Sequence, residues 1–215
     1  MSLCRSFVFF LTMDVRFAHP FTCVVSGPTG SGKTEFVAKL NENISDMMVL
    51  VPEKIVWCYG EWQRRLEKIR DVESIEGLAP KDTFDWREKG VVIIDDLMNE
   101  TNRSVTDLFT KGSHHRNISV MYIAQNLFNK GKEYRTISLN SHYIVFKNPR
   151  DSSQIIRLAK QAYTSRPKIA QQAFADATSD PYGYLLFDFK QSTPEKFRLR
   201  SKIFPDENRV VYVPI

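Results

Sequence analysis

Residues 27–34 read Gly27-Pro28-Thr29-Gly30-Ser31-Gly32-Lys33-Thr34. This stretch decides the fold, because it completes the GxxxxGK[ST] pattern of a phosphate-binding loop, or P-loop. An apolar run at 21–26 and helix-forming residues at 35–40 flank it, as that motif requires. The glycines allow successive backbone N–H groups to face one anion, to which the next helix presents its positive N-terminus. In this pattern Lys33 reaches the β and γ phosphates and the Thr34 hydroxyl ligates a metal ion. The sequence therefore predicts a nucleoside triphosphate site with Mg²⁺ as its metal.

An acidic strand end is the second part of such a site, and residues 90–96 fit it. They read Gly-Val-Val-Ile-Ile-Asp-Asp, in which four β-branched residues are typical of a strand buried on both faces. Two carboxylates follow at the strand tip, as in a Walker B motif. There Asp95 is expected to hold the Mg²⁺ water shell and Asp96 to orient or deprotonate the attacking water.

The composition is compatible with one α/β domain. The chain has 215 residues, of which 42% are apolar, enough to bury a substantial core. Its three cysteines, Cys4, Cys23 and Cys58, are widely separated, which predicts reduced thiols rather than disulfides or a zinc site. A net charge of +5 permits a nucleic-acid partner but is also common in proteins that bind none. The apolar stretch at 6–13 is too short to span a bilayer.

Strand-like and helix-like segments alternate along the chain. This alternation predicts a mostly parallel sheet flanked by helices, with its ligand at the carboxyl ends of the strands. The order favours the ASCE, or RecA-like, branch of P-loop NTPases, in which a further strand lies between the two Walker strands. We expect an N-terminal extension at 1–16 and one P-loop ATPase domain at 17–215. The expected strands are 21–26, 54–59, 72–78, 90–96, 117–126 and 142–147, the helices 35–40, 61–70, 104–111, 154–161 and 168–177, and a terminal hairpin pairs 184–189 with 196–203.

Several further motifs carry a resemblance to a known family. With the two Walker motifs, they are Pro20-Phe21, the segment 114–119 that leads to Ala124-Gln125-Asn126, and Phe146-Lys147-Asn148-Pro149-Arg150-Asp151. Together they resemble the viral DNA-packaging ATPases of the FtsK and HerA superfamily. Within it, the chain looks most like the poxvirus-type enzymes of Polinton (Maverick) elements and adintoviruses. The resemblance spans residues 17–204.

The resemblance implies roles for particular residues. Gln125 corresponds to the polar sensor at a strand tip, suited to contact the γ phosphate or the catalytic water. Members of the superfamily usually carry Glu where Asp96 stands, and the shorter Asp must approach the water about one methylene closer. Such motors work as homo-oligomeric rings in which an arginine reaches the neighbour's γ phosphate, and Arg116 and Arg150 are the candidates.

The activity that the resemblance implies is ATP-driven translocation of double-stranded DNA, which packages a viral or virus-like genome into a capsid. The basic segment 129–135 is a candidate DNA-contacting loop, through sequence-independent contacts to phosphates. Capsid portal or vertex proteins are possible partners, and the expected location is intracellular at the site of virion assembly, in the host nucleus or cytoplasm. The alternatives are another P-loop enzyme, such as a helicase or nucleotide kinase, and an assembly protein that binds nucleotide without turnover.

Overall fold

The computed structural model describes most of the chain. The described residues are 3–7, 14–62, 64, 66–80, 83, 85, 87–95, 97, 103–112, 117–128, 132–147 and 152–214.

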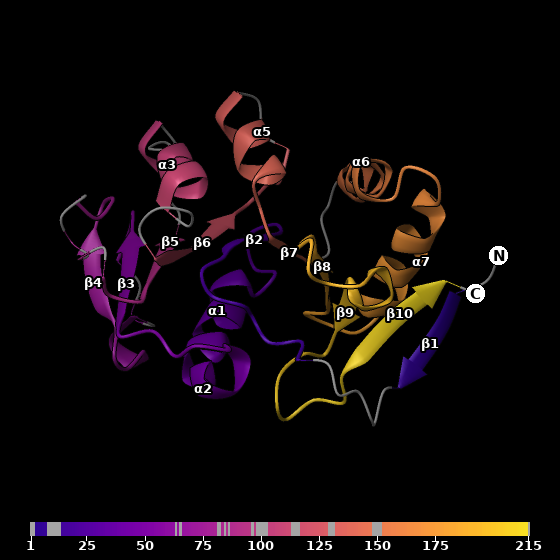
Figure 1. Ribbon diagram of the computed structural model, residues 1–215, viewed down its shortest axis with the longest axis horizontal. Coiled ribbons are helices and arrows are strands. Elements are labelled where there is room, and N and C mark those ends of the chain that lie inside the picture. The colour runs from indigo at the N-terminus through magenta and orange to yellow at the C-terminus, as the bar shows by residue number, and fades with distance from the viewer. Residues whose placement is uncertain are drawn as a thin grey trace.

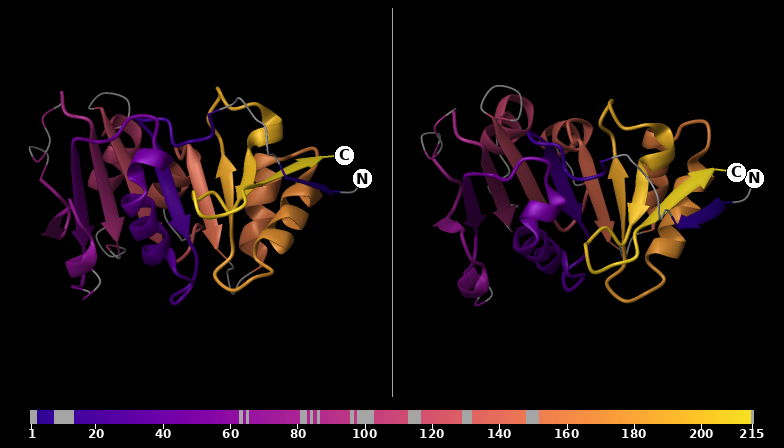
Figure 2. Two further views of the ribbon diagram at one scale, coloured as in Figure 1. Left: turned by 90° about the horizontal axis from the view of Figure 1, so that it is seen from below. Right: turned by 60° about the horizontal axis from the view of Figure 1, so that its bottom comes forward.

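These residues form one ten-stranded sheet with two halves (Figures 1 and 2). The strand order is β1-β10-β9-β8-β7-β2-β6-β5-β3-β4. From β7 to β4 all neighbours are parallel, whereas from β7 to β1 they are antiparallel. The strands are β1 (Leu3–Phe7), β2 (Thr22–Ser26), β3 (Lys54–Tyr59), β4 (Glu73–Glu76), β5 (Gly90–Asp95), β6 (Ile118–Ala124), β7 (Tyr143–Lys147), β8 (Tyr184–Asp188), β9 (Leu199–Ser201) and β10 (Val210–Pro214).

The parallel half confirms the predicted branch of P-loop folds. Strand β2 leads into the P-loop, and β6 lies between it and the acidic strand β5. The register aligns the carboxyl ends of the three strands, since Ser26 pairs with Ala124 and Asp95 with Ile123. The P-loop, the acidic tip and the end of β6 therefore meet at one edge of the sheet.

Helices cover both faces of the sheet (Figure 1). Helices α1 (Lys33–Glu42) and α2 (Ile44–Met47) pack on one face, where Phe36, Leu40 and Met47 join a buried cluster with Cys23 and Val25 of β2. The other face is covered by α3 (Arg103–Asp107) with the π-helical turn Leu108–Gly112, and by α5 (Lys132–Leu139), α6 (Ser153–Ala162) and α7 (Pro167–Ala177). None of the helices in these ranges is long and apolar enough to cross a membrane.

Two local predictions are wrong. The segment 61–70 is not an amphipathic helix: among its described residues, a 3₁₀ turn covers Leu66–Lys68. Its proposed apolar side does not reach the core as a unit, because Leu66 is buried while Trp62 is 52% exposed. The basic segment 129–135 is not simply a loop either. Residues 132–135 begin helix α5, which buries Ile137 in the core, and 129–131 lie outside the described residues.

The antiparallel half extends the predicted terminal hairpin. Strands β8 and β9 pair antiparallel as expected, but β10, which the sequence reasoning did not identify, pairs with β9 and also with β1. Leu3–Phe7 therefore forms the outer strand of this half. The division of the chain at residue 16 stays a prediction. Cys23 and Cys58 are buried free thiols, as expected.

Candidate nucleotide-binding site

The backbone of the P-loop depends on its glycines. Gly30 and Gly32 both have φ of +79°, a left-handed conformation that disfavours residues with a Cβ. Gly27 is required for space: a Cβ there would lie 2.7 Å from Ser31 Oγ and 2.9 Å from Lys147 Cβ. The loop thus closes tightly over the end of β2, and α1 starts directly after it.

Lys33, Thr34 and Asp95 meet at the mouth of this loop. Lys33 Nζ donates a hydrogen bond to the Pro28 carbonyl at 3.0 Å, and Thr34 Oγ1 donates one to Asp95 Oδ2 at 3.2 Å. The Asp95 side chain is buried although it is polar. The Thr34 hydroxyl from α1, the helix that follows β2, and the Asp95 carboxyl group from β5 are therefore in direct contact, although β6 separates β2 from β5 in the sheet.

The donor set fits a nucleotide and Mg²⁺. The hydroxyl and carboxylate oxygens of Thr34 and Asp95 are the hard ligands that Mg²⁺ takes in proteins. Ser31 Oγ is buried and has no hydrogen-bond partner among the described residues. Because buried hydroxyls in proteins normally have partners, this one is suited to donate to a phosphate oxygen held by the loop.

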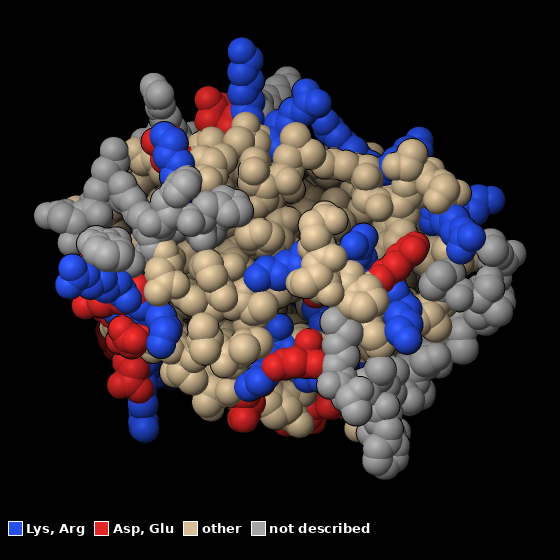
Figure 3. Space-filling view, in the orientation of Figure 1, with Lys and Arg blue, Asp and Glu red and all other residues tan. Residues whose placement is uncertain are grey.

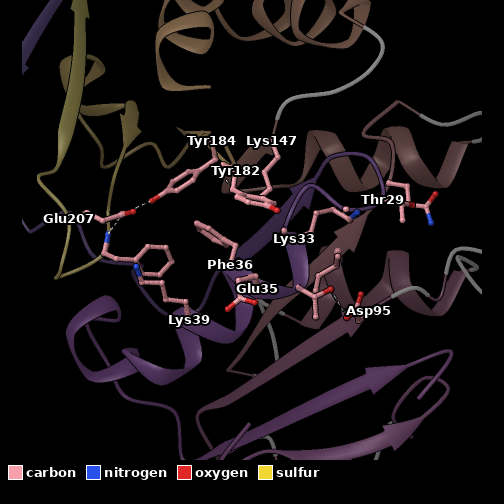
Figure 4. A pocket seen from close by; sticks show the side chains of 16 residues that line it. Thr29, Lys33, Glu35, Phe36, Lys39, Asp95, Lys147, Tyr182, Tyr184 and Glu207 are labelled. Carbon is pink, nitrogen blue, oxygen red and sulfur yellow. Dashed lines mark hydrogen bonds between the residues drawn. The ribbon is translucent and has the colours of Figure 1, made fainter. Parts of the chain in front are cut away.

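A pocket of about 610 Å³ extends along the loop and α1 (Figure 4). Lys33 and Asp95 lie toward one end of it, and Gln125, the exposed residue that follows β6, is also part of the lining. Tyr184 and Glu207 lie toward the other end. The full lining is Thr29, Gly30, Gly32, Lys33, Thr34, Glu35, Phe36, Lys39, Asp95, Ile123, Gln125, Lys147, Tyr182, Tyr184, Phe204 and Glu207.

The far end of the pocket is aromatic. The Phe36 ring packs edge-on against Tyr184 and Phe204, with centroid distances of 4.9 and 5.2 Å. The Tyr184 hydroxyl donates to Glu207 Oε2 at 3.1 Å and accepts the Ile203 N–H at 2.9 Å. Apolar ring faces with a few fixed polar groups suit a flat organic ligand such as a nucleobase.

Sequence reasoning missed this end of the pocket and also missed Lys147. In the sequence analysis Lys147 is only part of a family motif, yet it is the last residue of β7 and lies beside the P-loop. The sequence signal that could have indicated a site residue is a charged side chain at the end of an apolar strand. Tyr182, 71% exposed and with φ of +60°, also borders the loop, 3.3 Å from the Cβ position of Gly32.

Three expected site residues lie outside the described residues: Asp96, Arg116 and Arg150. Asp96 directly follows the end of β5, Arg116 precedes β6 by two positions, and Arg150 follows β7 by three. Their roles stay predictions.

A P-loop between a parallel strand and a helix, with an acidic strand and a polar strand tip beside it, defines the fold of the P-loop ATPases. No family model matches the sequence, and no curated protein matches it either.

Solved structures agree with this fold. The chain is similar to the genome-packaging NTPase B204 of Sulfolobus turreted icosahedral virus 2 in complex with ATPγS, at 12% identity and a TM-score of 0.56 over 91% of this chain and 98% of that one. It is also similar to B204, the DNA-packaging ATPase of Sulfolobus turreted icosahedral virus (11% identity, 92% and 99% covered, TM-score 0.54). A third similarity is to the cytoplasmic domain of the type VII secretion ATPase EccC of Thermomonospora curvata. The sequence identity is 11% and the TM-score 0.51, over 89% of this chain and 25% of that one. The shared feature is the ATPase fold.

Proposed function

We propose that this chain is an Mg²⁺-dependent ATPase that translocates double-stranded DNA and packages a viral or virus-like genome into a capsid. The observation that carries the enzymatic part is that residues of the P-loop, Thr34, Asp95 and Gln125 line one pocket, in which Thr34 and Asp95 are hydrogen-bonded. The DNA-packaging part is supported by the family motifs and by the B204 NTPases, which match this chain over nearly their full length. The affiliation with Polinton elements and adintoviruses rests on the sequence motifs.

Each residue of the proposed site has a distinct role in ATP hydrolysis. The loop N–H groups, Lys33 and Ser31 hold the phosphates, and Thr34 and Asp95 hold the metal ion, which when bound neutralises charge on the β and γ phosphates. Gln125 orients the attacking water, and Asp96 accepts its proton. Arg116 or Arg150 of a neighbouring subunit in a homo-oligomeric ring completes the site by stabilising charge at the γ phosphate.

The DNA face is proposed to include α5 and α6. Lys132 and Arg135 are exposed on α5, and Arg157 and Lys160 are exposed on α6. Lys and Arg side chains project from this side of the molecule at the top of Figure 3. Helix faces of this charge suit the phosphates of a duplex, so binding would be independent of sequence and would weaken as salt rises.

The partners and the location follow from the same proposal. The ring would engage portal or vertex proteins of a capsid at the intracellular site of virion assembly, in the host nucleus or cytoplasm. Co-purification of the chain with particles assembled in host cells would support this, and its absence from both particles and assembly sites would contradict it.

Steady-state ATP hydrolysis with and without linear double-stranded DNA tests the proposal, with Lys33→Ala as the inactive control. We expect DNA to raise turnover several-fold and added salt to remove the stimulation. ATP binding without turnover above the control would favour the assembly protein. Phosphate transfer to nucleoside monophosphates without any DNA requirement would favour a kinase.

A further inference from the structure

Lys147 lies against the P-loop. It ends β7, the strand next to β2, and its side chain starts next to Gly27, where its Cβ lies 2.9 Å from the Cβ position of that glycine. Its Nζ reaches Gly32, 3.8 Å from the corresponding position there. Although it lines the nucleotide pocket, Lys147 is only 3% exposed. Its ammonium group is therefore placed against the loop that holds the phosphates and is shielded from bulk water.

The surroundings of this ammonium group do not balance its charge. Nζ donates to the Tyr182 carbonyl at 2.8 Å and lies 5.8 and 5.4 Å from the ring centroids of Phe36 and Tyr184. Lys147 forms no ion pair with any residue that the structure describes. One carbonyl and two ring faces are weak compensation for a buried cation, which costs several kcal/mol to remove from water.

The charged groups around Lys147 act in opposite directions. The pKa of Lys147 is lowered to about 8, mainly by burial; Glu207 in the turn before β10 raises the pKa, and Lys33 of α1 lowers it by a smaller amount. Tyr184 of β8, which also faces the ammonium, stays neutral because burial raises its own pKa well above the usual value. A multiply charged anion in the P-loop would supply the missing negative charge.

The strand order assigns Lys147 to one end of that anion. Asp95 ends β5 and Gln125 follows β6, and both strands lie on one side of β2, so the γ phosphate and the metal belong on that side. Lys147 comes from β7, on the other side, next to the aromatic end of the pocket. It therefore faces the part of the nucleotide that ADP and ATP have in common.

We propose that Lys147 is a second cation of the nucleotide site, which attracts the phosphates nearest the ribose and takes up a proton as a nucleotide binds. This inference rests on the proposed nucleotide binding and goes beyond it, because it couples binding to pH. It also gives the two lysines different roles: Lys33 binds the β and γ phosphates, whereas Lys147 attracts the phosphates nearest the ribose, which ADP and ATP have in common.

Calorimetric titration of the full chain with ADP and with ATP tests the inference. In buffers of different ionisation enthalpy, the dependence of the observed enthalpy on the buffer gives the number of protons taken up. A group with a pKa near 8 that becomes fully protonated takes up about a tenth of a proton at pH 7, about half at pH 8 and most of one at pH 9. The phosphate groups of the nucleotide are ionised at high pH and take up no protons there, so a rise with pH indicates a group of the protein.

Variants assign the proton to Lys147. We expect Lys147→Met to abolish the rise in proton uptake and to weaken ADP and ATP binding by about tenfold each. Lys147→Arg should keep most of the affinity but take up no proton, because arginine stays charged. The matched control is Lys190→Met. Lys190 is half-buried, whereas Lys147 is buried, but Lys190 too donates to backbone carbonyls, those of Ala18 and Pro20, and has a pKa lowered by burial. It does not line the nucleotide pocket, so this variant should bind nucleotide and take up protons like the wild type.

The outcomes separate the two proposals. Nucleotide binding by the wild type with no rise in proton uptake between pH 7 and pH 9 would overturn the role of Lys147, and so would a rise that persists in Lys147→Met. This comparison in the wild type needs no variant and holds even if Lys147→Met fails to fold. Failure of the wild type to bind either nucleotide would instead overturn the proposed function.

Discussion

Replacement of Lys147 by methionine should stabilise the nucleotide-free protein. Methionine has a similar length and no charge, so it removes the cost of the buried ammonium while it keeps most of the packing against Phe36 and Tyr184. A folded-state pKa of about 8 in place of 10.5 corresponds to about 3 kcal/mol at 1.36 kcal/mol for each pH unit. Loss of the hydrogen bond to the Tyr182 carbonyl costs about 1 kcal/mol, which leaves a net gain of about 2 kcal/mol at pH 7.

The sign of the pH dependence follows from the lowered pKa. Below pH 8 Lys147 is charged in both the folded and the unfolded chain, so the wild type bears the full cost of burying the charge. Between pH 8 and 10.5 the folded protein loses this proton before the unfolded chain does, and the cost disappears. The advantage of the variant should therefore be complete at pH 7 and largely gone by pH 10.

Urea unfolding of both proteins at pH 7 and at pH 9.5, followed by circular dichroism, measures this difference. Taking the difference between variant and wild type cancels the other titrating groups that the two proteins share. A variant that is less stable than the wild type at pH 7, or an advantage that does not shrink at pH 9.5, would refute the reasoning about the buried charge.

Three further changes have defined outcomes. Asp95→Asn keeps the hydrogen bond with Thr34 but removes the carboxylate charge. Steady-state assays should therefore show that ATP hydrolysis falls by about 100-fold or more, while a fluorescent nucleotide still binds. Unchanged turnover would show that Asp95 is not a metal ligand. Gly27→Ala forces a Cβ against Ser31 and Lys147, so it should lower the free energy of unfolding by about 1–3 kcal/mol and abolish nucleotide binding. At Gly30 the space is open and only the positive φ opposes a Cβ, so Gly30→Ala should lower it by about 1 kcal/mol. Denaturant unfolding measures both losses. Arg200→Met leaves Asp188 buried without the partner that lies at 2.7 Å, and we expect a loss of about 3–5 kcal/mol in chemical denaturation; a loss under 1 kcal/mol would mean that this pair contributes little.

Most of the parallel half of the fold could be predicted from the sequence. Buried parallel strands are continuous apolar runs, and their limits are visible where polar residues or glycines begin, so 54–59 was predicted with the bounds that β3 has. The wrong prediction of a helix at 61–70 involves an amphipathic segment. Residues 61–70 have a helical pattern, but whether such a pattern forms a helix depends on a surface to receive its apolar side, and a local pattern contains no information about that surface.

The sequence by itself determined the chemistry that depends on residues close together in the chain. The P-loop needs glycines, Lys33 and Thr34 at fixed spacing, and an acidic pair at the end of a buried run predicts which strand supplies the metal ligand, because backbone geometry over a few residues dictates both. The tertiary structure alone decided which distant residues complete the pocket. Lys147, Tyr184 and Glu207 come from β7, β8 and the turn before β10, and they reach the nucleotide pocket only because β7 pairs with β2 and β8 pairs with β7. Strand pairing over more than a hundred residues results from burial of the whole sheet, so no local pattern around Lys147 could show that its ammonium group would lie beside the P-loop.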